Sequence, residues 1–179
     1  PTSIKLTESE QDDFDEQSEN IRRLIGKCRR DINKKIIPSK SLELAIFERS
    51  RIVKKAKNKI PQALKILKEY YDNSHQWLIY CDSMQQIEDL TEVLNLEGFD
   101  PFAYHSYLSK YERESALLRF KSAGGILLSI KCLDEGFNLP SVSHALIMAS
   151  DQNPRQFIQR RGRVLRKDDQ SNKKFASIF

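Results

Sequence analysis

The spacing of apolar residues along the chain changes close to residue 75. Before that point they recur every three, four or seven positions, which is the period of a helix with one buried face. Thr7 followed by Glu10 predicts a capping box at the start of a first helix, and Ser41 is the expected cap of a second. A third helix is expected over about 59–71. The buried face of the first helix is predicted to contain Phe14, Ile21, Ile25, Cys28 and Ile32.

After residue 75, short apolar runs alternate with helical stripes. Each apolar run is bounded by polar residues, which is typical of strands that are buried on both faces. Ser83 with Gln86 predicts another capping box, Ser109 with Glu112 caps the next helix, and Asn153-Pro154 opens a last one. The expected strands lie at 77–81, 102–105, 125–130, 142–148 and 174–179.

This alternation predicts an α/β fold. Strands separated by helices form a parallel sheet with helices on both faces, which is the doubly wound arrangement. We therefore expect a helical extension over 1–72, whose role the sequence does not assign, followed by a doubly wound domain over 73–179. Ligands of such domains bind beyond the carboxyl ends of the strands. The loops that follow the strands are thus where chemistry is expected.

Composition adds a net charge of +5, which is compatible with a nucleic-acid partner and does not require one. The charge is unevenly distributed: residues 8–19 hold seven acids and no base, 22–35 hold seven bases and one acid, and 49–68 hold eight bases and no acid. The first two runs are interpreted as solvated helix faces. The third either lies along a nucleic-acid duplex or is a solvated helical appendage. A further interpretation concerns the whole segment 1–72: the chain is then a scaffold, and this helical segment binds a protein partner.

Other features exclude several classes of protein. The three cysteines and three histidines are scattered and form no Cys-x-x-Cys pair, so neither a metal site nor a disulfide framework is expected, and reduced thiols favour a cytoplasmic location. No apolar run approaches the roughly 20 residues that span a bilayer, so no membrane partner is expected. The first residues are not a signal peptide and lack an initiator Met, which indicates a fragment of a longer protein.

A dense cluster of bases is the strongest chemical signal. Residues 155–167 hold six bases and no acid in a segment predicted to be helical. Bases packed this closely repel one another unless an anion lies nearby. Guanidinium groups suit phosphate because their planar donors match its oxygens and keep their charge. Arg163 and Arg166 are three residues apart, so they share one side of a helix and can grip one phosphate group.

Residues 159–166 read Gln-Arg-x-Gly-Arg-x-x-Arg, which resembles motif VI of superfamily 2 helicases of the DExH kind. The resemblance implies that Gln159, Arg163 and Arg166 are catalytic residues that face the ATP γ-phosphate and the attacking water across a cleft from a first domain. Arginine fingers of this kind are typically worth about 10³–10⁵ in rate. Gln159 stands where the DEAD-box RNA class has His, which argues against that class. The loop Glu-Gly-Phe-Asn-Leu-Pro at 135–140 resembles more closely that of DNA-directed enzymes of restriction, repair or phage systems.

Residues 126–140 resemble motif V, in which a strand enters a loop reading Glu-Gly-x-Asp-x-Pro. The resemblance implies that Ser129 and Lys131 contact the nucleic-acid backbone, whereas Gly136 and Asn138 approach the nucleotide. Asn138 stands where an acid is usual. Its side-chain oxygen still accepts a hydrogen bond from a ribose hydroxyl, but the charge is lost.

Residues 77–83 resemble motif IV, and the segment after them carries two further candidates. The resemblance implies that Ser83 meets a nucleic-acid phosphate at a helix start, where backbone N–H groups favour anions. Arg113 either contacts a phosphate or pairs with an acid. His105 is interpreted as a structural hydrogen-bonding residue, with a nucleic-acid contact as the alternative.

These motifs imply the second RecA-like domain of an ATP-dependent DNA helicase or translocase. A P-loop, Gly-x-x-x-x-Gly-Lys-Ser/Thr, is absent from the chain. Asp134-Glu135 is not the Mg²⁺-binding pair of motif II, because Phe137 stands where that motif requires an acid or His. ATP and Mg²⁺ are therefore expected to be held mainly by an N-terminal RecA-like domain of the same protein, and the fragment alone should not hydrolyse ATP. The alternative is a non-catalytic nucleic-acid-binding or scaffold module of the same fold.

Overall fold

The computed structural model describes residues 4–130, 142–148 and 177–178. The chain divides into two compact units, and each has its own core. Residues 4–59 are called the helical unit, and the part from Ile60 onward is called the α/β unit. No helix among the described residues is long and apolar enough to cross a membrane.

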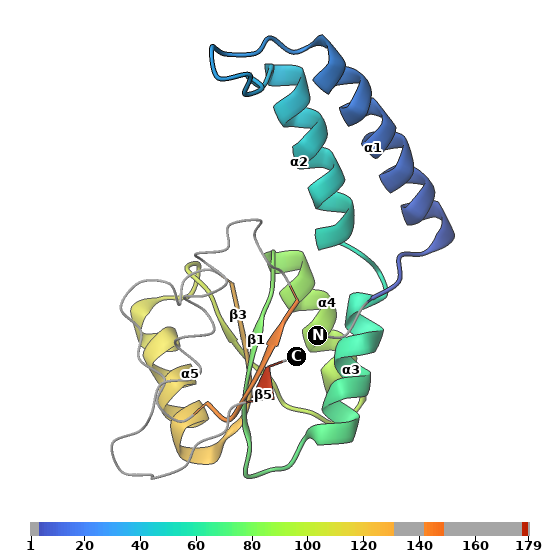
Figure 1. Cartoon of the computed structure of the whole chain (residues 1–179). Coiled ribbons are helices and arrows are strands. Elements are labelled where there is room, and N and C mark those ends of the chain that lie inside the picture. Colours follow the sequence, from blue (N-terminus) through green and yellow to red (C-terminus); the bar gives the residue numbers. More distant parts are fainter. Residues whose placement is uncertain (1–3, 131–141, 149–176, 179) are drawn as a thin grey trace. The chain divides into compact units, whose positions relative to one another are not determined.

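The described strands of the α/β unit form one parallel sheet (Figure 1). They are β1 (Gln76–Tyr80), β2 (Phe102–Tyr104), β3 (Gly125–Ser129), β4 (His144–Ile147) and β5 (Ser177–Ile178). Their order across the sheet is β2-β3-β1-β4-β5, so β1 lies at the centre between β3 and β4. This arrangement confirms the predicted α/β fold class and, within the described residues, the positions of the first four strands.

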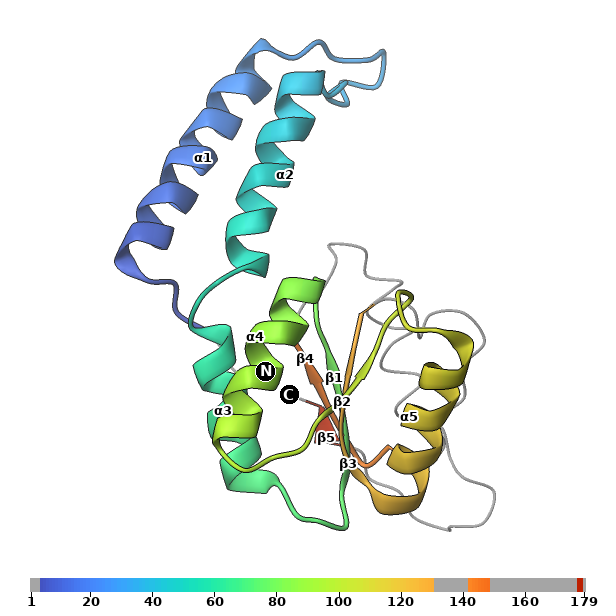
Figure 2. The same ribbon diagram turned by 180° about the vertical axis from the view of Figure 1, so that it is seen from behind.

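Helices cover both faces of this sheet (Figures 1 and 2). α3 (Lys59–Tyr70) and α4 (Met84–Leu96) pack on one face, and α5 (Lys110–Ala123) packs on the other. Successive side chains of a strand point to opposite faces. In β1, Trp77 therefore packs with α3 and α4, whereas Tyr80 packs with α5. Burying each such large side chain stabilises the fold by about 1.5–3 kcal/mol.

A glycine at the end of α5 lets β3 begin beside β1. Gly124 has a φ of +75°, and its N–H donates a hydrogen bond to the Phe120 carbonyl at 3.0 Å. A Cβ on Gly124 would lie 3.0 Å from the His75 carbonyl oxygen and 3.3 Å from that of Asn73. Only glycine fits both this backbone conformation and this close approach.

Two histidines pack at the amino ends of the central strands. The ring of His144 stacks on Trp77, with centroids 4.5 Å apart and an interplanar angle of 13°. The centroid of the His75 ring lies 4.3 Å from that of His144. Burial, and secondarily the nearby His75, lower the pKa of His144. These contacts give both histidines a structural environment, at the end of the sheet opposite to the one where ligands bind in such folds.

The helical unit is a hairpin of α1 (Glu8–Lys27) and α2 (Lys40–Lys54). Its core is small and centres on Ile21, Leu42 and Ala45. The capping box at Thr7 is confirmed: its N–H donates to Glu10 Oε2 at 2.9 Å, and its hydroxyl accepts from the Glu10 N–H at 3.4 Å.

Two details of the predicted first two helices were wrong. Ser39, not Ser41, caps α2, because its hydroxyl accepts a hydrogen bond from the Leu42 N–H. Ile32 lies outside α1 and is exposed, because the chain turns extended at Cys28, where φ is −75° and ψ is 146°. A repeat of apolar residues thus continued past the point at which the helix ends.

The third predicted helix belongs structurally with the sheet. The compact units meet between Lys59 and Ile60, whereas the apolar pattern placed the domain boundary after residue 72. Ala63, Ile66 and Leu67 of α3 are buried in the same cluster as β1 and α4. The pattern change near residue 75 marked where the strands begin, and the first helix of the α/β unit precedes it.

Candidate nucleic-acid and nucleotide site

The carboxyl ends of the parallel strands meet along one edge of the sheet. Tyr80 at the end of β1 pairs in register with Ser129 of β3 and Ile147 of β4, and Ser129 also pairs with Tyr104 of β2. Ligands of doubly wound sheets bind beyond this edge. The segments that follow these strands carry Ser83, Arg113 and the other predicted site residues, so the topology brings the starts of those segments together.

Ser83 caps α4 directly after β1. Its hydroxyl accepts a hydrogen bond from the Gln86 N–H at 3.3 Å, which leaves the hydroxyl hydrogen available to a further acceptor. The reciprocal half of the predicted capping box is absent, because the Gln86 side chain accepts from the Asp82 N–H at 2.8 Å instead. The first N–H groups of a helix have no partner within it. The position suits an anion such as a phosphate.

Ser129 is the last residue of β3, and its side chain is fully buried. Its hydroxyl donates to the Ile130 carbonyl at 2.9 Å, and its carbonyl accepts from the Cys81 N–H at 2.8 Å. These bonds fix the place where β3 leaves the sheet. A role for Ser129 in nucleic-acid binding stays a prediction, and in the described geometry its hydroxyl is directed into the protein's own backbone contacts.

Arg113 lies in the first turns of α5, which begins shortly after β2. Of the two alternatives for this residue, the ion pair does not occur among the described residues: Arg113 contacts no described carboxylate, whereas Lys110 on the same helix pairs with Glu114. The start of α5 is fixed by Ser109 and Glu112, which form a complete capping box. Hydrogen bonds from the Ser109 hydroxyl and N–H lower the pKa of the Glu112 carboxyl.

His105 follows β2 at the same edge. Its Nδ1 atom is buried, and it has no hydrogen-bond partner within the described part of the chain. The structural hydrogen bond expected of His105 is therefore not seen at this nitrogen. The centroid of the Tyr107 ring lies 6.1 Å from that of the His105 ring.

Two tyrosines near this edge were not singled out from the sequence. Tyr107 and Tyr111 stand on either side of the capping residue Ser109, and both side chains are largely exposed. Aromatic rings exposed beside a basic track can stack on bases. The sequence signal that could have identified them is the pair of aromatic residues on either side of a helix cap, where the pattern of apolar residues predicts no buried position.

The remaining predicted residues lie outside the described residues. They are Gln159, Arg163 and Arg166 of the catalytic set, Gly136 and Asn138 of the nucleotide set, and Lys131 of the nucleic-acid set. Their roles stay predictions.

The cysteine at the sheet edge has no catalytic character. Burial, and secondarily the charge of Asp82, raise the pKa of the Cys81 thiol to about 12. A thiol with this pKa is protonated at neutral pH and is a poor nucleophile or metal ligand. Among the described residues, no group of three or more His, Cys, Asp or Glu side chains could hold a metal ion.

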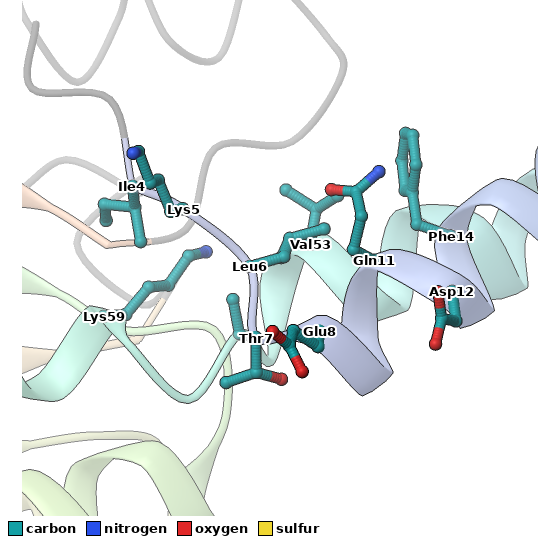
Figure 3. A pocket seen from close by; sticks show the side chains of 11 residues that line it. Ile4, Lys5, Leu6, Thr7, Glu8, Gln11, Asp12, Phe14, Val53 and Lys59 are labelled. Carbon is teal, nitrogen blue, oxygen red and sulfur yellow. The ribbon is translucent and has the colours of Figure 1, made fainter.

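A shallow hollow of about 580 Å³ lies on the helical unit (Figure 3). The segment 4–8 and the two helices form its walls, with Phe14 and Val53 among its apolar lining residues. None of the predicted site residues lines it, and its charged side chains form no arrangement typical of a nucleotide site. The hollow is therefore separate from the chemistry predicted at the sheet edge.

The described parallel sheet with helices on both faces, taken with the motifs of the sequence, is typical of a RecA-like domain of the kind found in nucleic-acid motors. A family model described as "Helicase conserved C-terminal domain" matches residues 48–168. The match covers more than half of the chain, and the chain belongs to this family, as a C-terminal domain of a superfamily 2 helicase or translocase.

The relatives of this chain include proteins named for RNA and for DNA. The chain is 31% identical over 100 residues to "ATP-dependent RNA helicase eIF4A" of Kluyveromyces lactis, which is 54% of this chain and 25% of that protein. It is 28% identical over 127 residues to "DNA 3'-5' translocase XPB2" of Sulfurisphaera tokodaii, which is 70% of this chain and 27% of that protein. The chain thus spans about a quarter of the length of these relatives.

A solved structure extends the similarity of fold to nearly the whole chain. The "Sulfolobus solfataricus SWI2/SNF2 ATPase core in complex with dsDNA" matches with a TM-score of 0.68 at 18% identity. The match covers 97% of this chain and 38% of that one. At this identity the similarity concerns the fold, and it includes the helical unit.

Proposed function

We propose that the protein containing this chain is an ATP-dependent DNA helicase or translocase. In this proposal the chain is its second RecA-like domain. The observation that carries the proposal is the family match over residues 48–168, which includes the arginine cluster of 155–167. The edge of the sheet adds support, because it gathers helix starts and loops where phosphate groups can bind.

The proposed roles divide between nucleotide and nucleic acid. Arg163 and Arg166, with Gln159, face the γ-phosphate, where fixed positive charge stabilises the charge that develops on the transferred phosphoryl group. Gly136 and Asn138 contact the nucleotide. The motif set implies ATP and Mg²⁺ held mainly by an N-terminal RecA-like domain.

The nucleic-acid backbone is proposed to run along the sheet edge, on Ser83, Ser129, Lys131 and Arg113. Ser83 and Arg113 have the clearest structural support. Ser83 lies at a helix start, and Arg113 has no acidic partner among the described residues. Movement of the two RecA-like domains during the ATP cycle would change the grip of these residues on the backbone.

DNA is proposed over RNA as the substrate. The alignment with the archaeal DNA translocase is longer than that with the yeast RNA helicase, at 127 against 100 residues. The fold of the complex with double-stranded DNA covers the helical unit as well as the α/β unit. Gln159 at the start of the arginine motif argues against the DEAD-box RNA class, and the loop sequence at 135–140 resembles that of DNA-directed enzymes. We further propose a cytoplasmic location, which reduced thiols such as Cys81 support.

The experiment replaces the two arginines in the longest natural protein that contains this chain. Arg163→Ala and Arg166→Ala should each lower the DNA-stimulated ATPase kcat by about 10³-fold or more while ATP binding is retained, because a finger acts on the transition state. Arg161→Ala is the matched control, because position 161 is left open by the motif pattern and we interpret its arginine as surface charge. Equal kcat values for the Arg161 and Arg163 variants would contradict the assigned roles.

The 179-residue chain should bind duplex DNA and show no Mg²⁺-dependent ATP hydrolysis, because it lacks a P-loop. ATP turnover by the pure chain would contradict the proposal. A non-catalytic binding module of the same fold is the second candidate, and the missing P-loop is equally natural there. If the longest natural protein that contains this chain binds DNA but hydrolyses ATP neither in the presence nor in the absence of DNA, that result would favour the binding module.

A further inference from the structure

The loop at the end of the helical hairpin is an ordered turn. We call residues 28–39, between α1 and α2, the hairpin tip. Arg30 and Ile36 form an antiparallel bridge across it, and the Ile37 N–H donates to the Arg29 carbonyl at 2.9 Å. The two sides of the tip are therefore held together by backbone hydrogen bonds.

Asp31 organises the apex of this turn. Its Oδ1 atom accepts hydrogen bonds from the N–H groups of Asn33 at 2.9 Å and Lys35 at 2.7 Å. Lys34 occupies the left-handed region with a φ of 61°, which is uncommon for residues other than glycine. The carboxylate of Asp31 is engaged by the backbone of the tip, so it fixes the turn.

The tip exposes two isoleucines to solvent, Ile32 at its apex and Ile37, which is 52% exposed. Ile32, at the apex, is 98% exposed, whereas Ile36 on the returning side packs against the hairpin core. Full exposure of an isoleucine in an ordered turn contributes nothing to the stability of the fold. The tip therefore displays Ile32 on a defined backbone.

Unpaired bases surround this isoleucine. The basic side chains of the tip form no ion pair with any carboxylate among residues 4–130. They are Arg29, Arg30, Lys34 and Lys35, and all four are exposed.

The other basic run of the chain is different, because several of its members have partners. Lys68 pairs with Glu97, Arg51 pairs with Glu48, and the Arg49 guanidinium lies 5.4 Å from the centroid of the Phe14 ring. The tip is therefore the better candidate for binding an external anion. The sequence interpretation had instead considered nucleic-acid binding for the run 49–68 and solvation for the run 22–35.

We propose that the hairpin tip is a second contact with duplex DNA, in which its bases bind phosphates and Ile32 enters the minor groove as an apolar wedge. This proposal rests on DNA being the substrate of the proposed motor. Minor-groove proteins often combine basic side chains with an inserted Ile, Leu or Phe that partly unstacks a base step. The bases of the tip are complementary in charge to the closely spaced phosphates of a duplex, and the exposed isoleucine at the apex is of the type that such proteins insert.

The first test removes the charge. In the 179-residue chain, the variant Arg29→Gln/Arg30→Gln/Lys34→Gln/Lys35→Gln is compared with the wild type by fluorescence anisotropy on a labelled DNA duplex over a range of salt. Each phosphate contact contributes about 0.9 to the slope of log K against log salt, so the slope should become shallower by about 3–4. The control is Arg119→Gln/Lys121→Gln on α5. An equal change of slope per charge removed in the control would overturn the proposal.

The second test removes the wedge. Ile32→Ser should abolish the rise in 2-aminopurine fluorescence that wild-type binding causes at an unstacked base step, and should weaken binding by about tenfold. Leu96→Ser, at an 81% exposed position in the α/β unit, is the matched control. Because both side chains are exposed, both variants should keep the wild-type Tm. An unchanged 2-aminopurine signal for Ile32→Ser would overturn the wedge.

Further outcomes separate this proposal from the proposed function. Tip variants that bind DNA like the wild type, together with a Ser83→Ala variant that binds weakly, would overturn the tip contact and leave the motor intact. Tip-dependent DNA binding in a protein whose ATPase is insensitive to Arg163→Ala would support the tip and contradict the motor. Tighter tip-dependent binding to an RNA duplex, or to phosphatidylserine vesicles, than to DNA would overturn the DNA contact.

Discussion

The two units of this chain differ in what their sequences specify. The α/β unit buries large side chains on both faces of its sheet, and its polar candidates are confined to one edge. The helical unit has a small core around Ile21, Leu42 and Ala45, and most of its residues are charged or exposed. Packing in a core restricts which residue can stand at each buried position. In an exposed hairpin, charged residues can stand at most positions without a loss of packing. The α/β unit is therefore specified by packing, and the helical unit by its turns and its charge.

The largest expected effect is in the core of the α/β unit. Phe120→Ala should lower the free energy of unfolding by about 3–5 kcal/mol, because the ring is fully buried between α5 and the sheet. Leu118→Ala on the same helix should change it by less than about 0.5 kcal/mol, because Leu118 is largely exposed. Urea unfolding monitored by the fluorescence of Trp77 measures both. Similar losses of unfolding free energy in the two variants would contradict the burial of Phe120 and the exposure of Leu118.

A smaller effect is expected at the glycine that joins α5 to β3. Gly124→Ala should cost about 2–4 kcal/mol, since the new Cβ would be strained by the positive φ and would press on the His75 carbonyl. Gly98→Ala is the matched control: its φ is +82°, but nothing lies within 4 Å of its Cβ position. It should cost only about 1 kcal/mol, from the backbone conformation alone. Equal midpoints in thermal unfolding would show that the close approach is absent.

In the helical unit, the turn at the tip should be the sensitive point. Asp31→Ala removes the acceptor for two backbone N–H groups and should cost about 1 kcal/mol. Amide hydrogen exchange of the tip should accelerate, while the exchange of β1 stays unchanged. Asp31→Asn keeps an acceptor oxygen and should retain most of the protection. Faster exchange throughout the α/β unit in Asp31→Ala would contradict the division into two units.

The smallest effect concerns pH and the histidines at the amino end of the sheet. The pKa of His144 lies below its usual 6.5 in the folded protein, so the unfolded chain binds the proton first as pH falls. The contribution of His144 to stability is therefore unchanged above about pH 6.5 and declines as pH falls through the folded pKa. The Tm of His144→Gln should decrease less between pH 7.5 and 5.5 than that of the wild type. Equal decreases of Tm in the wild type and in His144→Gln would contradict the lowered pKa of His144 in the folded protein.

The sequence alone determined the elements whose signals are local. The strands at Trp77, Phe102 and Gly125 followed from short apolar runs, and the capping boxes at Thr7 and Ser109 followed from side chains three residues apart. The motif order along the chain was enough to indicate the helicase family. These features depend on spacing within one segment, which the sequence states directly.

Only the tertiary structure decided the features that depend on distant partners. It placed α3 with the sheet, left Ile32 in solvent, and brought the ends of β1, β2 and β3 into register so that Ser83 and the start of α5 face the same edge. It also distinguished basic residues with partners from basic residues without them. Charge and apolarity are read from a sequence, but whether a side chain is paired or buried depends on segments that come together only when the chain folds.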